Sequence, residues 1–158
     1  MNSFFRRFFI LALTLATFTV VASAQDAKKL YQQGKALYDA KNYTQAVPKL
    51  KAAADKGNKK AQYRLGRCYE KGRGVSKNLQ MAFQLYTKAA AQNHAKSQYA
   101  LGRCYLRGKG TQANKEEARK WVVEAFKNPN GGSELKSKVQ KEAKGGDEKA
   151  REILQLIK

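Results

Sequence analysis

The sequence predicts an all-α solenoid in which antiparallel helix pairs stack along the chain. Residues 61–74 read AQYRLGRCYEKGRG and residues 97–110 read SQYALGRCYLRGKG, so 9 of 14 positions are identical at a register of 36 residues. Apolar residues in both copies recur at the spacing of three and four that marks a buried helical face. Because a unit of this length cannot bury its apolar face alone, neighbouring units must stack on one another.

The N-terminal segment, residues 1–24, is typical of a secretory signal peptide. Arg6 and Arg7 precede an apolar run over 8–21, and Ala22-Ser23-Ala24 follows, which predicts cleavage before Gln25. The alternative is a membrane anchor, but the run of 14 residues is shorter than the roughly 17 to 25 that a spanning helix needs. No later segment is apolar enough to cross a membrane. We therefore expect a periplasmic or secreted protein that does not span the membrane.

Residues 25–60 are expected to form the first helix pair. Its two helices carry apolar residues at helical spacing: Leu30, Gly34, Leu37, Ala46, Leu50 and Ala53. From Gly34 to Ala46 is 12 residues, whereas from Gly66 to Ala82 is 16. The first pair therefore has a connection four residues shorter than the later ones.

Residues 61–96 and 97–132 are expected to form the second and third pairs. The first helix of the second pair should span Lys59 to Lys71 and end at Gly72 and Gly74, since glycine takes positive φ without penalty. Asn78 can cap the helix that follows. The third pair repeats these signals at Gly108, Gly110 and Asn114. Inward positions of the second helices are Ala82, Leu85, Tyr86, Ala89 and Ala90, then Ala118, Trp121, Val122 and Ala125.

Two glycines stand in the middle of predicted helices. Gly66 and Gly102 occupy the same repeat position, where glycine costs about 0.5 to 1 kcal/mol relative to alanine. A cost repeated at one position indicates that the partner helix approaches closely there.

Residues 133–158 are expected to cap the stack. A loop, Asn128-Pro129-Asn130-Gly131-Gly132, interrupts the chain where a fourth repeat would start. Ser133 can cap a helix that runs through Lys144. The last helix places Ala150, Ile153, Leu154 and Ile157 inward, and it should cover the open apolar end of the solenoid.

The residues that could support chemistry are few. Cys68 and Cys104 stand at the same position of successive repeats, where equivalent points lie roughly 8 to 10 Å apart, beyond the ~7 Å Cα limit for a disulfide. We therefore expect two free, buried thiols, although export would allow a bridge. The sole histidine, His94, falls at a helix junction and is expected to be solvated. No ligand cluster, catalytic triad or phosphate loop is present, so we predict no enzyme activity, cofactor, metal site or small-molecule substrate.

The repeated motif resembles a known family. LGRCYEKGRGV at 65–75 and LGRCYLRGKGT at 101–111, each followed by an asparagine, an alanine and an aromatic residue, are similar to the Sel-one-like repeat. The first unit, with Gly34, Ala46, Leu50 and Ala53, is more similar to the parent tetratricopeptide repeat. The resemblance covers roughly residues 27–127 and implies a right-handed α-solenoid. Thr111 departs from the usual valine.

Positive charge is concentrated in the repeats. The formal charge is +20 in total, and the final segment, 134–158, holds seven Lys/Arg and five Asp/Glu, a net of +2. Without Arg6 and Arg7, residues 25–133 therefore carry +16. Such a field favours acidic proteins or polyanions as partners.

Aligning the first helices on Gly34, Gly66 and Gly102 groups the positive charge into columns. Offsets of three, four and seven place these columns on one face, away from the leucine stripe. The resemblance to tetratricopeptide folds implies that this face lines a concave groove that holds peptides. The predicted groove residues are Lys28, Tyr31, Lys35, Lys60, Tyr63, Arg67, Lys71, Lys96, Tyr99, Arg103 and Arg107, opposed by Asp39 alone.

Two functions fit these residues. The first is an exported, non-enzymatic scaffold that holds an acidic peptide or protein in this groove, where Lys and Arg pair with carboxylates and Tyr adds apolar contact. The second is a polyanion-binding protein that engages phosphorylated glycolipid or nucleic acid by charge. A third interpretation is a solvated basic face with tyrosines half buried between helices.

Overall fold

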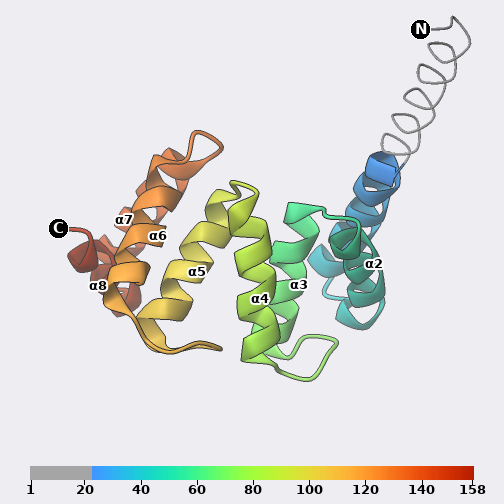
Figure 1. The fold of residues 1–158 in the computed structure, drawn as a ribbon, viewed down its shortest axis with the longest axis horizontal. Helices are drawn as coiled ribbons and strands as arrows, with labels where there is room; N and C mark the ends of the chain where they lie inside the picture. Colours follow the sequence, from blue (N-terminus) through green and yellow to red (C-terminus); the bar gives the residue numbers. More distant parts are fainter. Residues whose placement is uncertain (1–22) are drawn as a thin grey trace, which may run out of the picture.

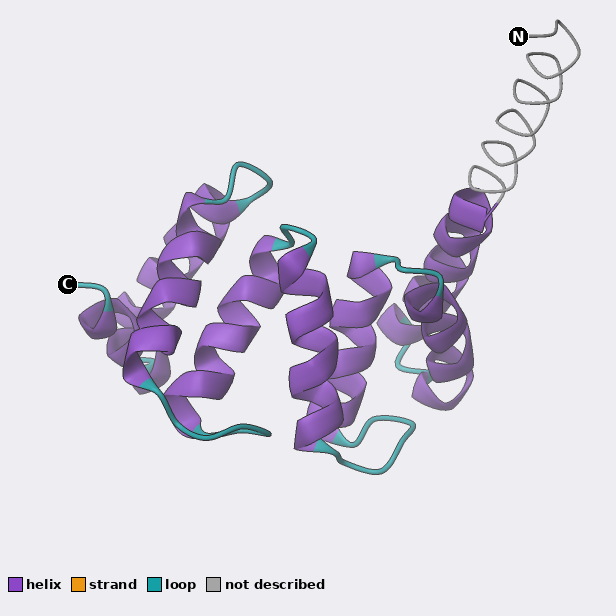
Figure 2. Ribbon diagram, in the orientation of Figure 1, coloured by secondary structure: helices purple, strands orange, loops and turns teal. Residues whose placement is uncertain are grey.

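The computed structural model describes residues 23–158, which form eight helices and, within that range, no strand (Figures 1 and 2). The first helix covers residues 23–39. The others are α2 (Tyr43–Asp55), α3 (Lys59–Lys71), α4 (Leu79–Ala91), α5 (Ala95–Arg107), α6 (Lys115–Lys127), α7 (Gly132–Lys144) and α8 (Glu148–Leu156).

The helices are packed as sequential pairs. Helix α3 packs against α4 and α5 against α6 within a pair, while α2 contacts α3 and α4 contacts α5 between pairs. In Figure 1 the pairs follow one another along the long axis of the molecule, from α2 near one end to α8 at the other. The predicted all-α stack of helix pairs is therefore confirmed.

Short polar side chains begin most of these helices. The side chains of Asn58, Asn78 and Asn114 accept hydrogen bonds from backbone N–H groups of the first turns of α3, α4 and α6. Such bonds satisfy donors that a helix leaves unpaired at its start. Gly72 and Gly108 end α3 and α5 with φ of 66° and 60°. The predicted bounds of Lys59 to Lys71 and the predicted caps Asn78 and Asn114 are correct.

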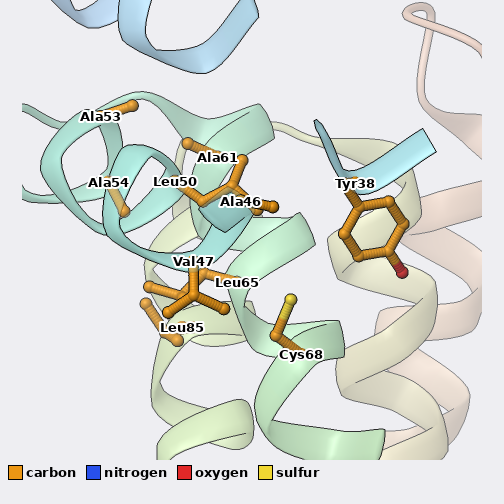
Figure 3. Packing of buried hydrophobic residues seen from close by; sticks show 10 residues of the cluster. All are labelled: Tyr38, Ala46, Val47, Leu50, Ala53, Ala54, Ala61, Leu65, Cys68 and Leu85. Atoms are coloured by element: carbon orange, nitrogen blue, oxygen red, sulfur yellow. The ribbon is translucent and has the colours of Figure 1, made fainter. Parts of the chain in front are cut away.

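Three clusters of buried side chains form the core. In the cluster drawn in Figure 3, residues of α2, α3 and α4 meet Tyr38 of the first helix. A second cluster joins α4 to α5, and a third joins α6 to α7 and α8. The predicted inward residues Ala82, Leu85, Tyr86, Ala89 and Ala90 are all buried. Trp121 is only half buried, because its indole nitrogen reaches out to donate a hydrogen bond to Glu117 at 3.1 Å.

The mid-helix glycines lie where two helices of a pair meet. A Cβ on Gly66 would lie 2.7 Å from the ring of Tyr86 in α4, and a Cβ on Gly102 would lie 2.8 Å from Val122 in α6. Gly34 has the same relation to Leu50 of α2, at 2.9 Å. The close approach predicted at Gly66 and Gly102 is confirmed, and the first pair shows it as well.

The second glycine of each GxG turn packs against the preceding helix pair. A Cβ on Gly74 would lie 2.5 Å from the backbone carbonyl of Tyr43, at the start of α2. Gly110 meets the backbone of Leu79, at the start of α4, in the same way. The longer turn of the later repeats is therefore a contact between pairs as well as the end of a helix.

The capping helices differ from the prediction at their first residue. Gly131, with φ of 99°, holds the N-cap position of α7, and Ser133 makes no capping hydrogen bond, so the predicted cap is wrong. The helix begins at Gly132 because this residue packs against the carbonyls of Ala125 and Phe126, where a Cβ would lie 2.5 to 2.7 Å away. Ala150 and Ile153 of α8 are buried in the last cluster, as expected for a cap.

The predicted signal peptide lies outside the described residues, except for Ser23 and Ala24. These two lie in the first helix. Within residues 23–158, no helix has both the length and the apolar composition that crossing a membrane requires.

Candidate partner-binding face

The predicted groove residues lie on three helices, each the first of its pair. We call this set the helix-A face. It consists of Lys28, Tyr31 and Lys35 on the first helix, Lys60, Tyr63, Arg67 and Lys71 on α3, and Lys96, Tyr99, Arg103 and Arg107 on α5. The five lysines are exposed, whereas the tyrosines and arginines are half buried. The face thus has an outer layer of ammonium groups over an inner layer of rings and guanidinium groups.

The tyrosines of this face pack against aromatic neighbours. Tyr63 lies 5.9 Å from Tyr86, and Tyr99 stacks on Phe126 at 6.0 Å, in each case between ring centroids. Arg103 lies over the Tyr99 ring at 5.9 Å. Much of the tyrosine surface is therefore used between helices, which is what the third interpretation of the sequence expected of these side chains.

Two acidic residues neutralise part of the face. Asp39 pairs with Lys35 at 2.7 Å and with Arg64 at 3.0 Å, and the hydrogen bond from Lys35 holds the pKa of this carboxyl below its usual value. Glu152 of α8 pairs with Arg107 at 2.7 Å. Asp39 is therefore not alone in opposing the positive charge, because the capping helix brings a second carboxylate.

A third carboxylate, Glu70, lies half buried where α3, α4 and the turn after α5 meet. It accepts a hydrogen bond from the Tyr86 hydroxyl at 2.9 Å and pairs with Lys109 at 3.6 Å. Burial alone would raise its pKa, but this hydrogen bond and the charges of Arg103 and Lys109 lower it. Glu70 therefore stays ionised and ties the second pair to the third.

Four lysines of the face form no ion pair among residues 23–158: Lys28, Lys60, Lys71 and Lys96. The charges of two of them, Lys60 and Lys96, act together with burial to lower the pKa of the His94 imidazole. Arg67 and Arg103 also form no ion pair within residues 23–158, but they are half buried, so the exposed lysines are the part of the face most accessible to an anion.

His94 is half buried, so the expectation that it is solvated was wrong. Its ring packs edge-on to Tyr63 at 5.3 Å between centroids, and Nδ1 lies 2.8 Å from the Ser97 hydroxyl. Burial and, after it, the charges of Lys59, Lys96 and Lys60 lower its pKa from 6.5 to about 4. His94 is therefore neutral at pH 7.

Sequence reasoning did not assign Arg64, Lys59 or His94 to the candidate site. Arg64 has no basic counterpart at the same position of the other first helices, so aligning these helices did not identify it. In the structure it pairs with Asp39 and donates a hydrogen bond to the Tyr31 hydroxyl at 3.4 Å. His94 stands 36 residues after the N-cap Asn58. That register was the available signal that His94 holds a structural position.

The sequence predicted that the helix-A face lines a concave groove. The structure has a shallow hollow at the first helix and the end of α2, lined by Asp26, Lys29, Leu30, Gln33 and Lys56. None of these residues belongs to the helix-A face, so the groove along that face stays a prediction.

The two thiols are buried and free. Burial raises the pKa of each of Cys68 and Cys104 to about 11, so neither thiol is a nucleophile near neutral pH. In the part of the chain that the structure describes, no group of His, Cys, Asp and Glu residues could hold a metal ion. The chemistry that the face itself offers is the binding of negative charge.

Stacked helix pairs with surface columns repeated from pair to pair define an α-solenoid scaffold. The family model of the Sel1 repeat matches residues 59–94 and 95–128, which hold the pairs α3–α4 and α5–α6. The chain is therefore a Sel1 repeat protein with the SLR fold, as the LGRCY motifs predicted. Proteins of this tetratricopeptide-like family are typically non-catalytic adaptors that bind other proteins.

Among the solved structures similar to this chain are two with related repeats. The crystal structure of a Sel1 repeat protein from Oxalobacter formigenes is 33% identical with a TM-score of 0.62, and the match covers 80% of this chain and 54% of that one. The antigen c5321, a protective antigen present in uropathogenic Escherichia coli strains that displays an SLR fold, is 28% identical with a TM-score of 0.65; the match covers 84% and 29%. The chain therefore spans about half or less of the length of these proteins. No curated protein matches it.

Proposed function

We propose that this protein is an exported, non-enzymatic adaptor that binds an acidic peptide or an acidic segment of a protein on its helix-A face, in the periplasm or outside the cell. The observation that carries the proposal is the row of unpaired lysines, Lys28, Lys60 and Lys96, at the same position of three successive pairs. Lys71 adds a fourth unpaired charge on α3.

The free lysines are suited to a partner that spreads its charge along its length. A single exposed ion pair contributes about 0.2 to 1 kcal/mol, so no single lysine could hold a partner. Lysines repeated along the solenoid would contribute together, and the half-buried tyrosines beside them would add apolar contact and hydroxyl groups. An acidic segment lying across the three helices fits this arrangement.

The alternative is a polyanion-binding protein. The net charge of +16 on residues 25–133 supports it, since charge alone attracts nucleic acid or a phosphorylated glycolipid. Against it stands the packing of Tyr63 and Tyr99 on Tyr86 and Phe126, which leaves less ring surface for stacking with bases.

A labelled peptide of ten aspartates tests the proposal. Its affinity would be measured by fluorescence anisotropy for the chain starting at Gln25 and for the triple variant Lys28→Gln, Lys60→Gln, Lys96→Gln. The matched control is Lys49→Gln, Lys51→Gln, Lys88→Gln, which removes the same charge from exposed positions of α2 and α4.

We expect the face variant to lose roughly tenfold in affinity, as three exposed ion pairs would give, and the control to lose no more than about twofold. Equal losses in the two variants would contradict the proposal. A single strand of ten thymidines that binds more tightly than the peptide would favour the polyanion function. In that case affinity should fall steeply as salt rises.

A further inference from the structure

The junction between the starts of α3 and α5 holds three lysines and one half-buried imidazole. Lys59 and Lys60 open α3, and Lys96 lies in the first turn of α5, which begins directly after His94. All three ammonium charges act on His94. The ring is held in place by Tyr63 on one side and by the Ser97 hydroxyl on the other.

No carboxylate balances this group. Among residues 23–158, none of these three lysines forms an ion pair with an acidic side chain. The one hydrogen bond that the structure gives Lys59 runs from Nζ to the backbone carbonyl of Gln92, at 2.9 Å, which carries no full charge. Like charges held together in this way repel one another, and an added anion would relieve the repulsion.

We propose that Lys59, Lys60, Lys96 and His94 form a subsite for one carboxylate of the acidic partner, and that His94 takes up a proton from solvent when this carboxylate binds. The inference rests on the proposed function, because it assigns one place on the helix-A face to one group of the partner. One ring nitrogen forms an N–H bond with a proton taken from solvent, so a neutral imidazole becomes an imidazolium ion beside a carboxylate.

The physical reason for proton uptake is that the lysines and a bound carboxylate act on the imidazole with opposite charge. Burial, and after it the lysine charges, keep the imidazole neutral in the free protein, and a bound carboxylate would oppose the lysine charges at close range. A negative charge within about 4 to 6 Å raises the pKa of a basic group by about 1 to 3 units. The Ser97 hydroxyl can accept a hydrogen bond from Nδ1–H, so this nitrogen keeps a hydrogen-bond partner when the ring is protonated.

Linkage then sets the direction of the pH dependence. Because binding takes up a proton, the affinity for an acidic peptide should rise as pH falls from 7.5 to 5.5. For a bound imidazole that titrates near pH 6, the expected gain over this interval is about fourfold. Aspartate side chains, with an ordinary pKa of about 3.9, stay ionised throughout.

Nuclear magnetic resonance can read this group directly, since His94 is the single histidine of the protein. The titration of its imidazole would be followed by long-range ¹H–¹⁵N correlation, in the free protein and with a saturating peptide of ten aspartates. We expect the midpoint to move up by about two pH units on binding, from about 4 to near 6. The variant His94→Gln should lose the gain in affinity between pH 7.5 and pH 5.5, so the ratio of its affinities at these two pH values is compared with the same ratio for the wild type.

The outcomes separate the two proposals. If the peptide binds but the His94 titration does not move, the subsite is wrong while the proposed function stands. If the peptide does not bind at all, both are wrong. A double variant, Lys60→Gln with Lys96→Gln, should reduce affinity about fivefold and remove most of the shift, and an unchanged shift in that variant would also overturn the subsite.

Discussion

At the scale of single residues, the glycine in the middle of the first helix of each pair sets how closely the two helices approach. Gly66 faces Tyr86, whose side chain is 1% exposed and whose hydroxyl donates to Glu70. The ring has no room to move away from an added methyl group. The glycine is therefore required by packing, although helix propensity alone disfavours it.

Whether Gly66→Ala raises or lowers the free energy of unfolding tests this account. Helix propensity would stabilise the protein by about 1 kcal/mol, whereas overpacking typically destabilises by about 1 to 3 kcal/mol. We expect a net loss of about 1 to 2 kcal/mol, measured by urea denaturation. The control Gly145→Ala, at φ of −76° with its nearest neighbours at 3.4 and 3.5 Å, should change stability by less than about 0.5 kcal/mol. Stabilisation by Gly66→Ala would contradict the packing.

His94 gives the folded protein a pH dependence of its own. Its pKa is lower in the folded protein, at about 4, than its ordinary value of 6.5, so the unfolded chain binds more protons between these values. Stability should therefore fall as pH drops from 6.5 toward 4. The carboxyls of Asp39 and Glu70 have pKa values lowered from 3.8 and 4.5, so their contributions are lost mainly below pH 5.

The urea midpoint at pH 7.0 and at pH 5.0 checks this expectation. The decrease in midpoint between the two should be smaller in His94→Gln than in the wild type. Only the difference between the two pH values is compared, because the substitution also alters the contacts with Tyr63 and Ser97. The same decrease in both proteins would show that His94 is not responsible.

At the scale of helices and turns, the sequence predicted local features better than contacts between pairs. The bounds of α3 follow from signals within the segment itself, with Asn58 as the N-cap and Gly72 at the end. The packing of Gly74 on Tyr43 and the pairing of Arg107 with Glu152 join residues 31 and 45 positions apart. No local pattern marks such contacts, because they depend on how one pair sits on another.

The same division applies to the candidate site. Spacing along the first helices placed its eleven residues on a common face. It did not show that Glu152 of α8 pairs with Arg107, or that the charges of Lys60 and Lys96 act on His94. Of the predicted face, Lys35 and Arg107 are paired with carboxylates, and the exposed residues without an ion pair among 23–158 are Lys28, Lys60, Lys71 and Lys96.

Gly74→Ala measures the contribution of the contact between pairs. Gly57 offers a matched control, since its φ of 83° is also positive but no heavy atom lies within 4 Å of an added Cβ. Both substitutions strain the backbone by about 1 kcal/mol, and only Gly74→Ala also collides with the backbone of α2. We expect Gly74→Ala to destabilise by at least about 1 kcal/mol more than Gly57→Ala. Equal losses would mean that the turn only ends its helix.

At the scale of the whole molecule, the last helix closes the stack. Ile153 and Ala150 of α8 are buried with Val122, Phe126 and Val139 from α6 and α7. Removing 147–158 would expose this cluster, since a solenoid without its cap presents an open apolar end. We expect the truncated protein to aggregate or self-associate in size-exclusion chromatography. A truncated protein that stays monomeric and unfolds cooperatively would refute the capping role.

The central claim is that the first helix of each pair, and not the second, meets an acidic partner. Backbone amide chemical shifts, recorded while a peptide of ten aspartates is added, test it most directly. We predict that the largest changes fall on the first helix, α3 and α5, around Lys28, Lys60 and Lys96. Changes of equal size on α2, α4 and α6, or changes spread evenly over the basic surface, would contradict the claim.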